Sequence, residues 1–206
     1  MSNEPSGPQP RTLDIADPGP LGLACFALTT FVLSVFNAGL LDAQAQPVVL
    51  GLALFYGGLA QVIAGVLEFL KKNLFGATAF TSYGAFWMAY WYLSSHPEAF
   101  VQGIDPALRA QGVGVFLLGW TIFTAYMLIA VTKVNGGLTF TFSVLLGAFA
   151  CLTLGDFTGV VLLTRLGGYF GLAAALGAWY CSFAGVVNFT HGRTVLSVFP
   201  RQARAA

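Results

Sequence analysis

Six long apolar runs, separated by short polar segments, dominate the pattern of hydrophobic and polar positions along the chain. A helix needs about 20 apolar residues to cross the hydrocarbon core of a bilayer. The runs have about that length, so the pattern predicts an all-α integral membrane protein whose fold is a six-transmembrane-helix bundle. The runs are Pro20–Leu41, Val48–Leu70, Phe75–Leu93, Val113–Thr132, Gly137–Gly155 and Leu166–Val187.

The segments outside the runs are short, and we expect one domain with two tails. Residues 1–18 are polar and rich in proline, without the cationic, apolar and cleavage-site order of a signal peptide, and are predicted to form a disordered cytosolic tail. Residues 19–190 form the predicted transmembrane domain, and residues 191–206 form a second cytosolic tail. The longest outer loop, Ser94–Gly112, is predicted to be a solvated connection.

Basic residues orient the predicted bundle. An even number of crossings puts both termini on one side of the membrane, and Lys and Arg are enriched in cytosolic segments. Two basic residues, Arg109 and Arg165, fall on the side opposite the termini. We therefore expect both termini in the cytosol, and the protein in the plasma (inner) membrane. The basic residues on the side of the termini are Arg11, Lys71, Lys72, Lys133, Arg193, Arg201 and Arg204.

Composition excludes several classes of function. Charged residues make up 8% of the chain, against roughly 25% in soluble domains, and the net charge of +1 argues against a nucleic-acid partner. Inside the runs the one charged residue is Glu68, whose spacing predicts an i,i+4 pair with Lys72 at the cytosolic interface. Both histidines, His96 and His191, lie outside the runs. We therefore predict no catalytic residue, no metal site and no cofactor, and a protein that is not an enzyme.

Passage of a small solute fits the neutral polar residues inside the runs. Hydroxyl and amide groups can replace part of the hydration of a carboxylate without holding it as a full ion pair. Alternatively, the hydroxyls bond the carbonyl four residues earlier in their own helix, and the aromatic residues Trp87, Tyr90, Trp91 and Tyr92 form a belt at the membrane interface. The candidate polar residues are Thr29, Thr30, Gln61, Thr81, Ser82, Tyr83, Thr139 and Thr141.

Glycines mark two further features. Gly57 and Gly58, shortly before Gln61, permit either a bend in the second run or close packing against another helix. In the sixth run Gly167, Gly171 and Ala175 recur every four residues, which predicts a face for close helix packing within one subunit or between subunits. The three cysteines lie far apart in apolar runs and are interpreted as small apolar residues.

Four segments carry a resemblance to a known family. They are DPGPLGLACF at 17–26, FYGGLAQVIAGVLEF at 55–69, NLFGATAFTSYGAFW at 73–87 and GRTVL at 192–196. Together they resemble the acetate uptake transporter family, which includes bacterial succinate–acetate permeases and fungal acetate permeases. The resemblance implies a homo-hexamer of six-helix subunits in the lipid bilayer, each with its own path for acetate or a similar small carboxylate, and succinate, formate or propionate as substrates of some members.

The family's opening signature is usually Asn-Pro-Ala-Pro-Leu-Gly-Leu, and here Asp17 and Gly19 depart from it. Pro20 suits a first helical turn, and the free amides at such a helix start attract a carboxylate. Asp17 either adds a negative charge at this place or caps the helix. The matching positions are Pro18, Pro20, Leu21, Gly22 and Leu23.

The resemblance also implies an apolar constriction at Phe26, Tyr83 and Leu145, with the Tyr83 hydroxyl as its one polar group. Without a buried titratable group, a coupled proton would travel on the substrate or through water. The sequence therefore predicts a passive or proton-coupled transporter or channel for acetate and related monocarboxylates. Alternatives are another small solute such as ammonium, or a membrane sensor or scaffold without flux. The predicted substrate path consists of Phe26, Tyr83, Leu145, Pro18, Pro20, Leu21, Gly22, Thr30, Gln61 and Thr81.

Overall fold

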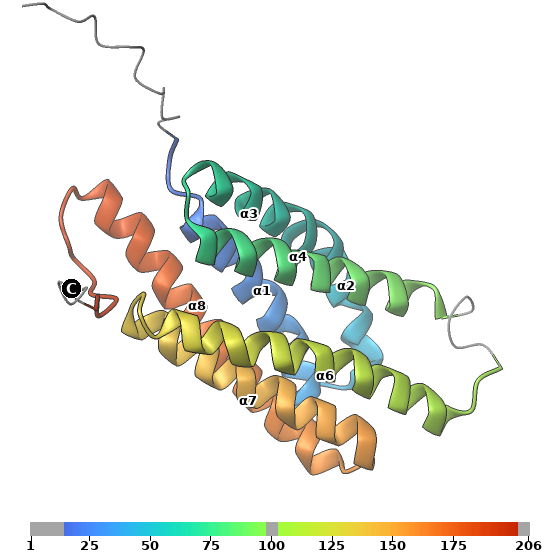
Figure 1. Cartoon of the computed structure of the whole chain (residues 1–206). Coiled ribbons are helices and arrows are strands. Elements are labelled where there is room, and N and C mark those ends of the chain that lie inside the picture. Colours follow the sequence, from blue (N-terminus) through green and yellow to red (C-terminus); the bar gives the residue numbers. More distant parts are fainter. Residues whose placement is uncertain (1–14, 98–102, 202–206) are drawn as a thin grey trace, which may run out of the picture.

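A computed structural model of the chain describes residues 15–97 and 103–201, and the remaining parts of the predicted tails and outer loop lie outside these residues. Within the described residues, helical segments cross the molecule six times, which confirms the predicted all-α bundle (Figure 1). The segments are α1 (Gly19–Asn37), η1 (Ala43–Val48), α2 (Val49–Leu54), η2 (Phe55–Ala60), α3 (Gln61–Leu70), α4 (Leu74–Ser95), α6 (Pro106–Val131), α7 (Gly136–Thr158) and α8 (Val161–Thr190).

Five of the crossings in the described residues are long and apolar enough to span a bilayer: α1, the continuous stretch Ala43–Leu70, α6, α7 and α8. The sixth, α4, has the length, with 22 residues, but falls outside that group. Its sequence is rich in Ser, Thr, Tyr and Trp, whose polar atoms lower the mean hydropathy without adding charge. α4 lies beside α3 and runs along the bundle like the other helices (Figure 1).

Short polar caps set where the helices begin and end. Asp105 accepts a hydrogen bond from the amide of Ala107 at 2.8 Å and, with Pro106 in the first turn, starts α6. The second half of the predicted loop Ser94–Gly112 is therefore helical, and that part of the loop prediction is wrong. At the other end of the next helix, Gly159 has a φ of +70° and ends α7, a backbone conformation that favours glycine.

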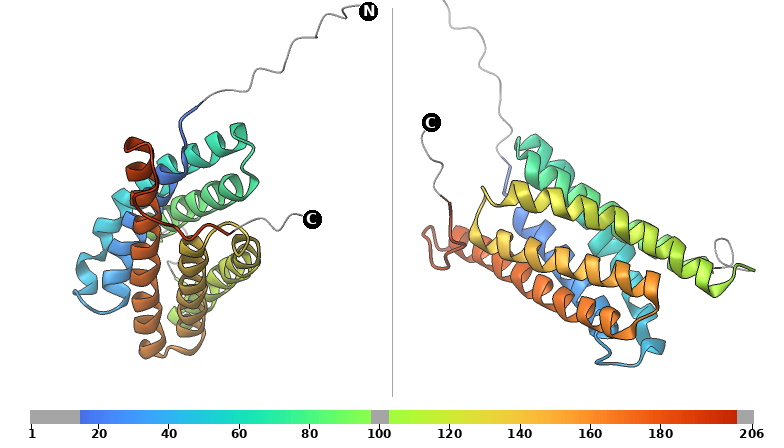
Figure 2. Two further views of the ribbon diagram at one scale, coloured as in Figure 1. Left: turned by 90° about the vertical axis from the view of Figure 1, so that its left-hand side faces the viewer. Right: turned by 60° about the horizontal axis from the view of Figure 1, so that its bottom comes forward.

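Both described ends of the chain lie at the same end of the bundle, which we call the terminal end, and the opposite end is the distal end (Figure 2). The segment after α8 folds back along the bundle rather than leaving it. The amides of Gly136 and Gly137, at the start of α7, donate to the carbonyls of Phe199 and Val198 at 2.9 and 3.1 Å. The described part of the predicted C-terminal tail is therefore attached to the helices.

The glycine stripe of α8 packs inside the subunit. A Cβ on Gly168 would overlap the backbone amide of Ala38, the residue that follows α1, and a Cβ on Gly171 would come 3.1 Å from the Cβ of Ser34 in α1. Gly167 faces Leu152 of α7 instead. Because glycine has no side chain, α8 packs closely against both α1 and α7. The predicted packing face therefore lies within the subunit.

The second crossing changes helix type where the two glycines stand. η2 is a π-helical turn, in which an extra residue widens the helix, and Gly57 and Gly58 are both buried in it. A Cβ on Gly57 would lie 2.8 Å from the Cβ of Thr29 in α1. A Cβ on Gly84 of α4 would lie 3.0 Å from the carbonyl oxygen of Gly58. Both predictions for Gly57 and Gly58 are therefore confirmed. The helix changes its geometry at these glycines, and α1 and α4 pack closely against them.

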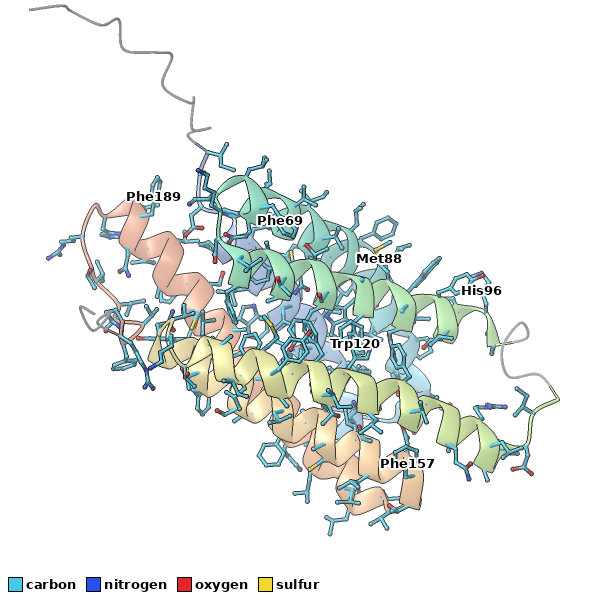
Figure 3. The ribbon with its side chains drawn as sticks, viewed as in Figure 1. Phe69, Met88, His96, Trp120, Phe157 and Phe189 are labelled. Carbon is cyan, nitrogen blue, oxygen red and sulfur yellow. The ribbon has the colours of Figure 1, made fainter. Side chains whose placement is uncertain are left out.

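Aromatic rings fill the centre of the bundle between α1, α4, α6 and α7. The Tyr83 ring has four neighbours within 6.1 Å between centroids, namely Phe26, Trp120, Phe123 and Phe142. Figure 3 shows Trp120 in this central position, with His96 toward the distal end and Phe69 and Phe189 toward the terminal end. Trp87 belongs to the core as well, with 2% of its surface exposed, so its predicted place in an interfacial belt is wrong.

Candidate substrate path

Two cavities lie between the helices, one toward each end of the bundle. The terminal cavity has a volume of about 310 Å³ and reaches the helix ends at Asp17, Asn73 and Asn188. The distal cavity is smaller, about 40 Å³, and reaches Asn37 and Gly167 near the opposite end. Both cavities are lined mainly by apolar and neutral polar side chains.

Three residues line both cavities: Phe26 of α1, Tyr83 of α4 and Leu145 of α7. Their exposed fractions are 6%, 3% and 4%. The rings of Phe26 and Tyr83 lie 5.8 Å apart between centroids. These side chains therefore form the boundary between the two cavities, at the place where sequence reasoning expected a constriction.

The hydroxyl of Tyr83 is used inside the protein. It lies 2.9 Å from Thr124 Oγ1, and Thr124 donates its own hydrogen to the carbonyl of Trp120 at 2.8 Å. Tyr83 must then be the donor toward Thr124. The predicted polar group thus bonds to α6, and the boundary is lined by two aromatic rings and a Leu side chain.

Buried polar atoms without a protein partner gather at the two cavities. Among the described residues, Gln61 is fully buried, lines the terminal cavity, and has no partner for either atom of its amide. Thr30 Oγ1 and Trp87 Nε1 are also unpaired, and both residues line the distal cavity. An unsatisfied buried group costs about 1–3 kcal/mol, so a polar solute or water in the cavities stabilises these positions.

Gln61 lies deep in the bundle, level with Phe26. α1 and α3 run in opposite directions, and Gly19 at the start of α1 lies beside Glu68 near the end of α3. Gln61 and Phe26 are each seven residues, about two helical turns, further in from that point. The unpaired amide therefore stands at the inner end of the terminal cavity.

The remaining predicted path residues divide into two groups. Pro20 lines the terminal cavity, and its carbonyl accepts a hydrogen bond from Ser182 at 2.6 Å. Pro18 is buried and Gly22 packs on the Phe80 ring, but neither lines a described cavity. The structure thus brings Pro20, Thr30 and Gln61 together with the three boundary residues and leaves Pro18 and Gly22 as packing positions.

Leu21 and Thr81 also lie away from both described cavities. Leu21 is 42% exposed on the outside of α1. Thr81 packs against Gly65, at the contact between α3 and α4, and its Oγ1 has no hydrogen-bond partner in the described residues. Three other candidates follow the alternative interpretation and bond the carbonyl four residues earlier: Thr29, Thr139 and Thr141.

A sequence profile of the GPR1/FUN34/yaaH family matches residues 2–201. The chain belongs to this family. The predicted resemblance is confirmed by two relatives. The succinate-acetate/proton symporter SatP of Escherichia coli (strain K12) is 38% identical over 184 residues, covering 89% of this chain and 95% of SatP. Acetate permease A of Emericella nidulans is 39% identical over 196 residues, covering 89% of this chain and 65% of that protein.

A solved structure of the bacterial acetate channel SatP has the same fold, with a TM-score of 0.82 at 38% identity. The alignment covers 90% of this chain and 99% of the SatP chain. The chain thus spans nearly all of the bacterial family member, but less than two thirds of acetate permease A. The six-helix bundle is therefore the fold of a known family member.

Pro18 is the N-cap residue of α1 and the helix has no side-chain cap hydrogen bond, which contradicts the predicted capping role of Asp17. Asp17 Oδ1 accepts a hydrogen bond from the amide of Gly19 at 3.2 Å, at the start of α1. It also lies 3.5 Å from Lys71 Nζ. One of the amides at the start of α1, that of Gly19, is therefore hydrogen-bonded to a carboxylate of the protein.

Glu68 differs from its prediction. It is 1% exposed, lines the terminal cavity, and accepts a hydrogen bond from Asn73 Nδ2 at 2.8 Å, rather than pairing with Lys72. α3 ends at Leu70 and Lys72 has a φ of +60°, so Lys72 does not continue the helix face. A buried titratable group therefore lies on the candidate path, contrary to the expectation that there was none.

Sequence reasoning also missed several lining residues. Phe86, Trp87 and Phe149 enclose the distal cavity. Asn73, Asn135 and Asn188 lie around the terminal cavity. The asparagines had a sequence signal, because each stands where an apolar run begins or ends on the side of the termini. The aromatic residues had none, since a core ring and a ring facing a cavity share the same apolar pattern.

Proposed function

We propose that this protein is a transporter or channel that carries acetate and related small monocarboxylates across a membrane. The observation that carries the proposal is the pair of cavities that meet at Phe26, Tyr83 and Leu145. The unpaired buried polar atoms of the described residues lie mainly beside these cavities, as expected for a path that polar solutes occupy. The bacterial and fungal relatives, named for acetate, support the same substrate class.

The chemistry of the path suits a small organic acid. A simple carboxylic acid has a pKa near that of glutamate, about 4.3, and is almost wholly ionised at neutral pH. The Gln61 amide offers an N–H donor to a carboxylate oxygen, and its carbonyl accepts the O–H of a protonated acid. The apolar boundary beyond it accommodates a methyl group and selects against larger or more hydrated solutes.

We further propose a homo-hexamer in the plasma (inner) membrane, with both termini in the cytosol and transport in place of catalysis. The excess of basic residues on the side of the termini supports this orientation. Large apolar side chains cover the outside of the bundle, and they need lipid or neighbouring subunits against them. Examples are Phe55 at 65%, Ile122 at 60% and Ile129 at 73% exposed.

Counterflow in liposomes tests the function directly. The purified protein is reconstituted into vesicles preloaded with unlabelled acetate, and the entry of labelled acetate is followed. We expect transient accumulation that propionate inhibits, that succinate inhibits less because of its second charge, and that ammonium leaves unchanged. Entry equal to that of empty vesicles would overturn the proposal, and competition by ammonium alone would identify the other solute class.

A further inference from the structure

Glu68 is a buried acid at the mouth of the terminal cavity. Its side chain lies between the start of α1 and the start of α4, where two glycines leave room for it. A Cβ on Gly76 would come 2.9 Å from its carboxyl carbon, and a Cβ on Gly19 would come 3.3 Å from its Oε1. Glu68 has 1% of its surface exposed and lines the cavity, so its carboxyl group faces the cavity and not the outside of the bundle.

A second carboxyl group lies close to Glu68. The same Cβ position on Gly19 is 3.3 Å from Asp17 Oδ1, so the oxygens of Asp17 and Glu68 lie within twice that distance of each other. Asp17 also lines the terminal cavity. The resemblance implies asparagine at this position, where this chain has aspartate.

One cation faces the two acids in the described residues. Lys71 Nζ lies 3.5 Å from Asp17 Oδ1, and the partner of Glu68 is the neutral amide of Asn73. The other titratable groups that line this cavity are Cys181 of α8 and Tyr83 of α4, which are ordinarily neutral at pH 7. With both acids ionised the cluster therefore carries one net negative charge, and one proton neutralises it.

The ligand position lies beyond this cluster. Gln61 stands on the same face of α3 as Glu68, two turns further in, and its fully buried amide has no partner in the described residues. An acid that moves between the terminal end and Gln61 passes the two carboxyl groups. The charge of the cluster therefore acts on the substrate before it reaches the boundary residues.

We infer that Asp17 and Glu68 form a proton-binding gate for the carboxylic acid substrate at the mouth of the terminal cavity. The inference rests on the proposed function and adds to it the residues that couple transport to protons. The ionised pair repels a carboxylate, and a proton taken from the aqueous side by a carboxyl oxygen of the pair removes the repulsion. Asp17 and Glu68 are then selectivity residues, alongside the apolar boundary.

The test is the pH profile of acetate counterflow, with equal pH inside and outside the vesicles and the rate of empty vesicles subtracted. We expect the wild-type rate to fall as pH rises from 6 to 8. Glu68→Gln, which mimics the protonated form, is expected to flatten the profile and to be roughly fivefold faster than wild type at pH 8, the factor for one unit charge a few ångströms away in water.

Asp17→Asn is the second variant, and because the Asp17 side chain is 60% exposed, it is expected to fold. It leaves Glu68 and Lys71 with no net charge, so its rate at pH 8 is also expected to exceed that of wild type. Asp105→Asn, which keeps a good helix cap at the distal end, is the control and is expected to follow wild type. If both Glu68→Gln and Asp17→Asn show the pH profile of wild type, the gate is overturned and acetate transport is unaffected. If the wild-type protein itself shows no counterflow, the proposed function is overturned.

Discussion

Gln61 combines an energetic cost with a proposed function. Burying an amide without hydrogen bonds destabilises a fold, yet Gln61 is fully buried with both amide atoms unpaired in the described residues. Most buried polar side chains nearby are satisfied within the protein, such as Thr29, which bonds the carbonyl of Cys25 at 2.9 Å. The unpaired amide beside the cavity therefore supports the proposal that Gln61 binds the substrate.

Replacing Gln61 with Leu tests this reasoning, since the two side chains are similar in size. We expect acetate counterflow to fall about tenfold, as one hydrogen bond to a charged group is worth roughly 1.5–3 kcal/mol. Thermal stability should stay the same or rise, because the unpaired amide is gone. Thr29→Val is the control, because Thr29 is equally buried but its hydroxyl has a hydrogen-bond partner, and this variant should keep the wild-type flux. A Gln61→Leu protein with wild-type flux would show that the amide does not contact the substrate.

The role of a single residue could be predicted from the sequence only where a local motif identifies it. Phe26, Tyr83 and Leu145 were predicted from motifs, and the structure brings them together at one boundary. The surroundings of Glu68 were missed because helical spacing assumes that the helix continues to Lys72, and it ends at Leu70. Trp87 was assigned to an interfacial belt because its sequence context does not show whether an aromatic ring faces inward or outward.

At the scale of elements, small residues decide which helices touch. α8 contacts α1 and α7 through adjacent glycines, and η2 contacts α1 and α4 through Gly57 and Gly58. Apolar runs predicted all six crossings, because their length reflects the thickness of the bilayer. The early start of α6 and the π-turn were not predicted, since a polar first turn resembles a loop and helix type depends on tertiary packing.

Gly168→Ala is expected to disturb the contact between α8 and α1. The added methyl would overlap the backbone of Ala38, and overpacking of this kind costs about 1–3 kcal/mol. The melting temperature in detergent should therefore fall. Gly112→Ala is the matched control: nothing lies within 4 Å of its added Cβ, and alanine favours a helix by about 1 kcal/mol. Equal melting temperatures for the two variants would contradict the packing account.

At the scale of the whole molecule, the bundle has two chemically different ends. The terminal end holds a charged and polar mouth formed by Asp17, Glu68, Lys71 and several asparagines, and the distal cavity is smaller and has no charged residue in its lining. This asymmetry agrees with the uneven distribution of basic residues along the sequence. On the proposed path, a solute would pass a charged mouth on one side of the apolar boundary and an uncharged cavity on the other.

The orientation of the bundle gives a prediction of its own. Because basic residues gather on the side of the termini, a green fluorescent protein joined after Ala206 should be fluorescent in the cytosol. An alkaline phosphatase joined after Gly103, in the connection between α4 and α6, should be active outside. The reverse pair of results would show that the terminal end faces outward.

The central claim is that acetate passes between the two cavities, through the boundary of Phe26, Tyr83 and Leu145. The most direct measurement is acetate counterflow through Leu145→Trp, beside Leu154→Trp, which changes a residue of the same helix that is 51% exposed. Both proteins should elute like wild type, and Leu145→Trp, which places a larger side chain at a buried position, is expected to melt at a lower temperature than Leu154→Trp. We predict that Leu145→Trp loses at least about 90% of the flux, since its ring fills the gap, and that Leu154→Trp retains it. A folded Leu145→Trp protein that transports acetate at the wild-type rate would contradict the account.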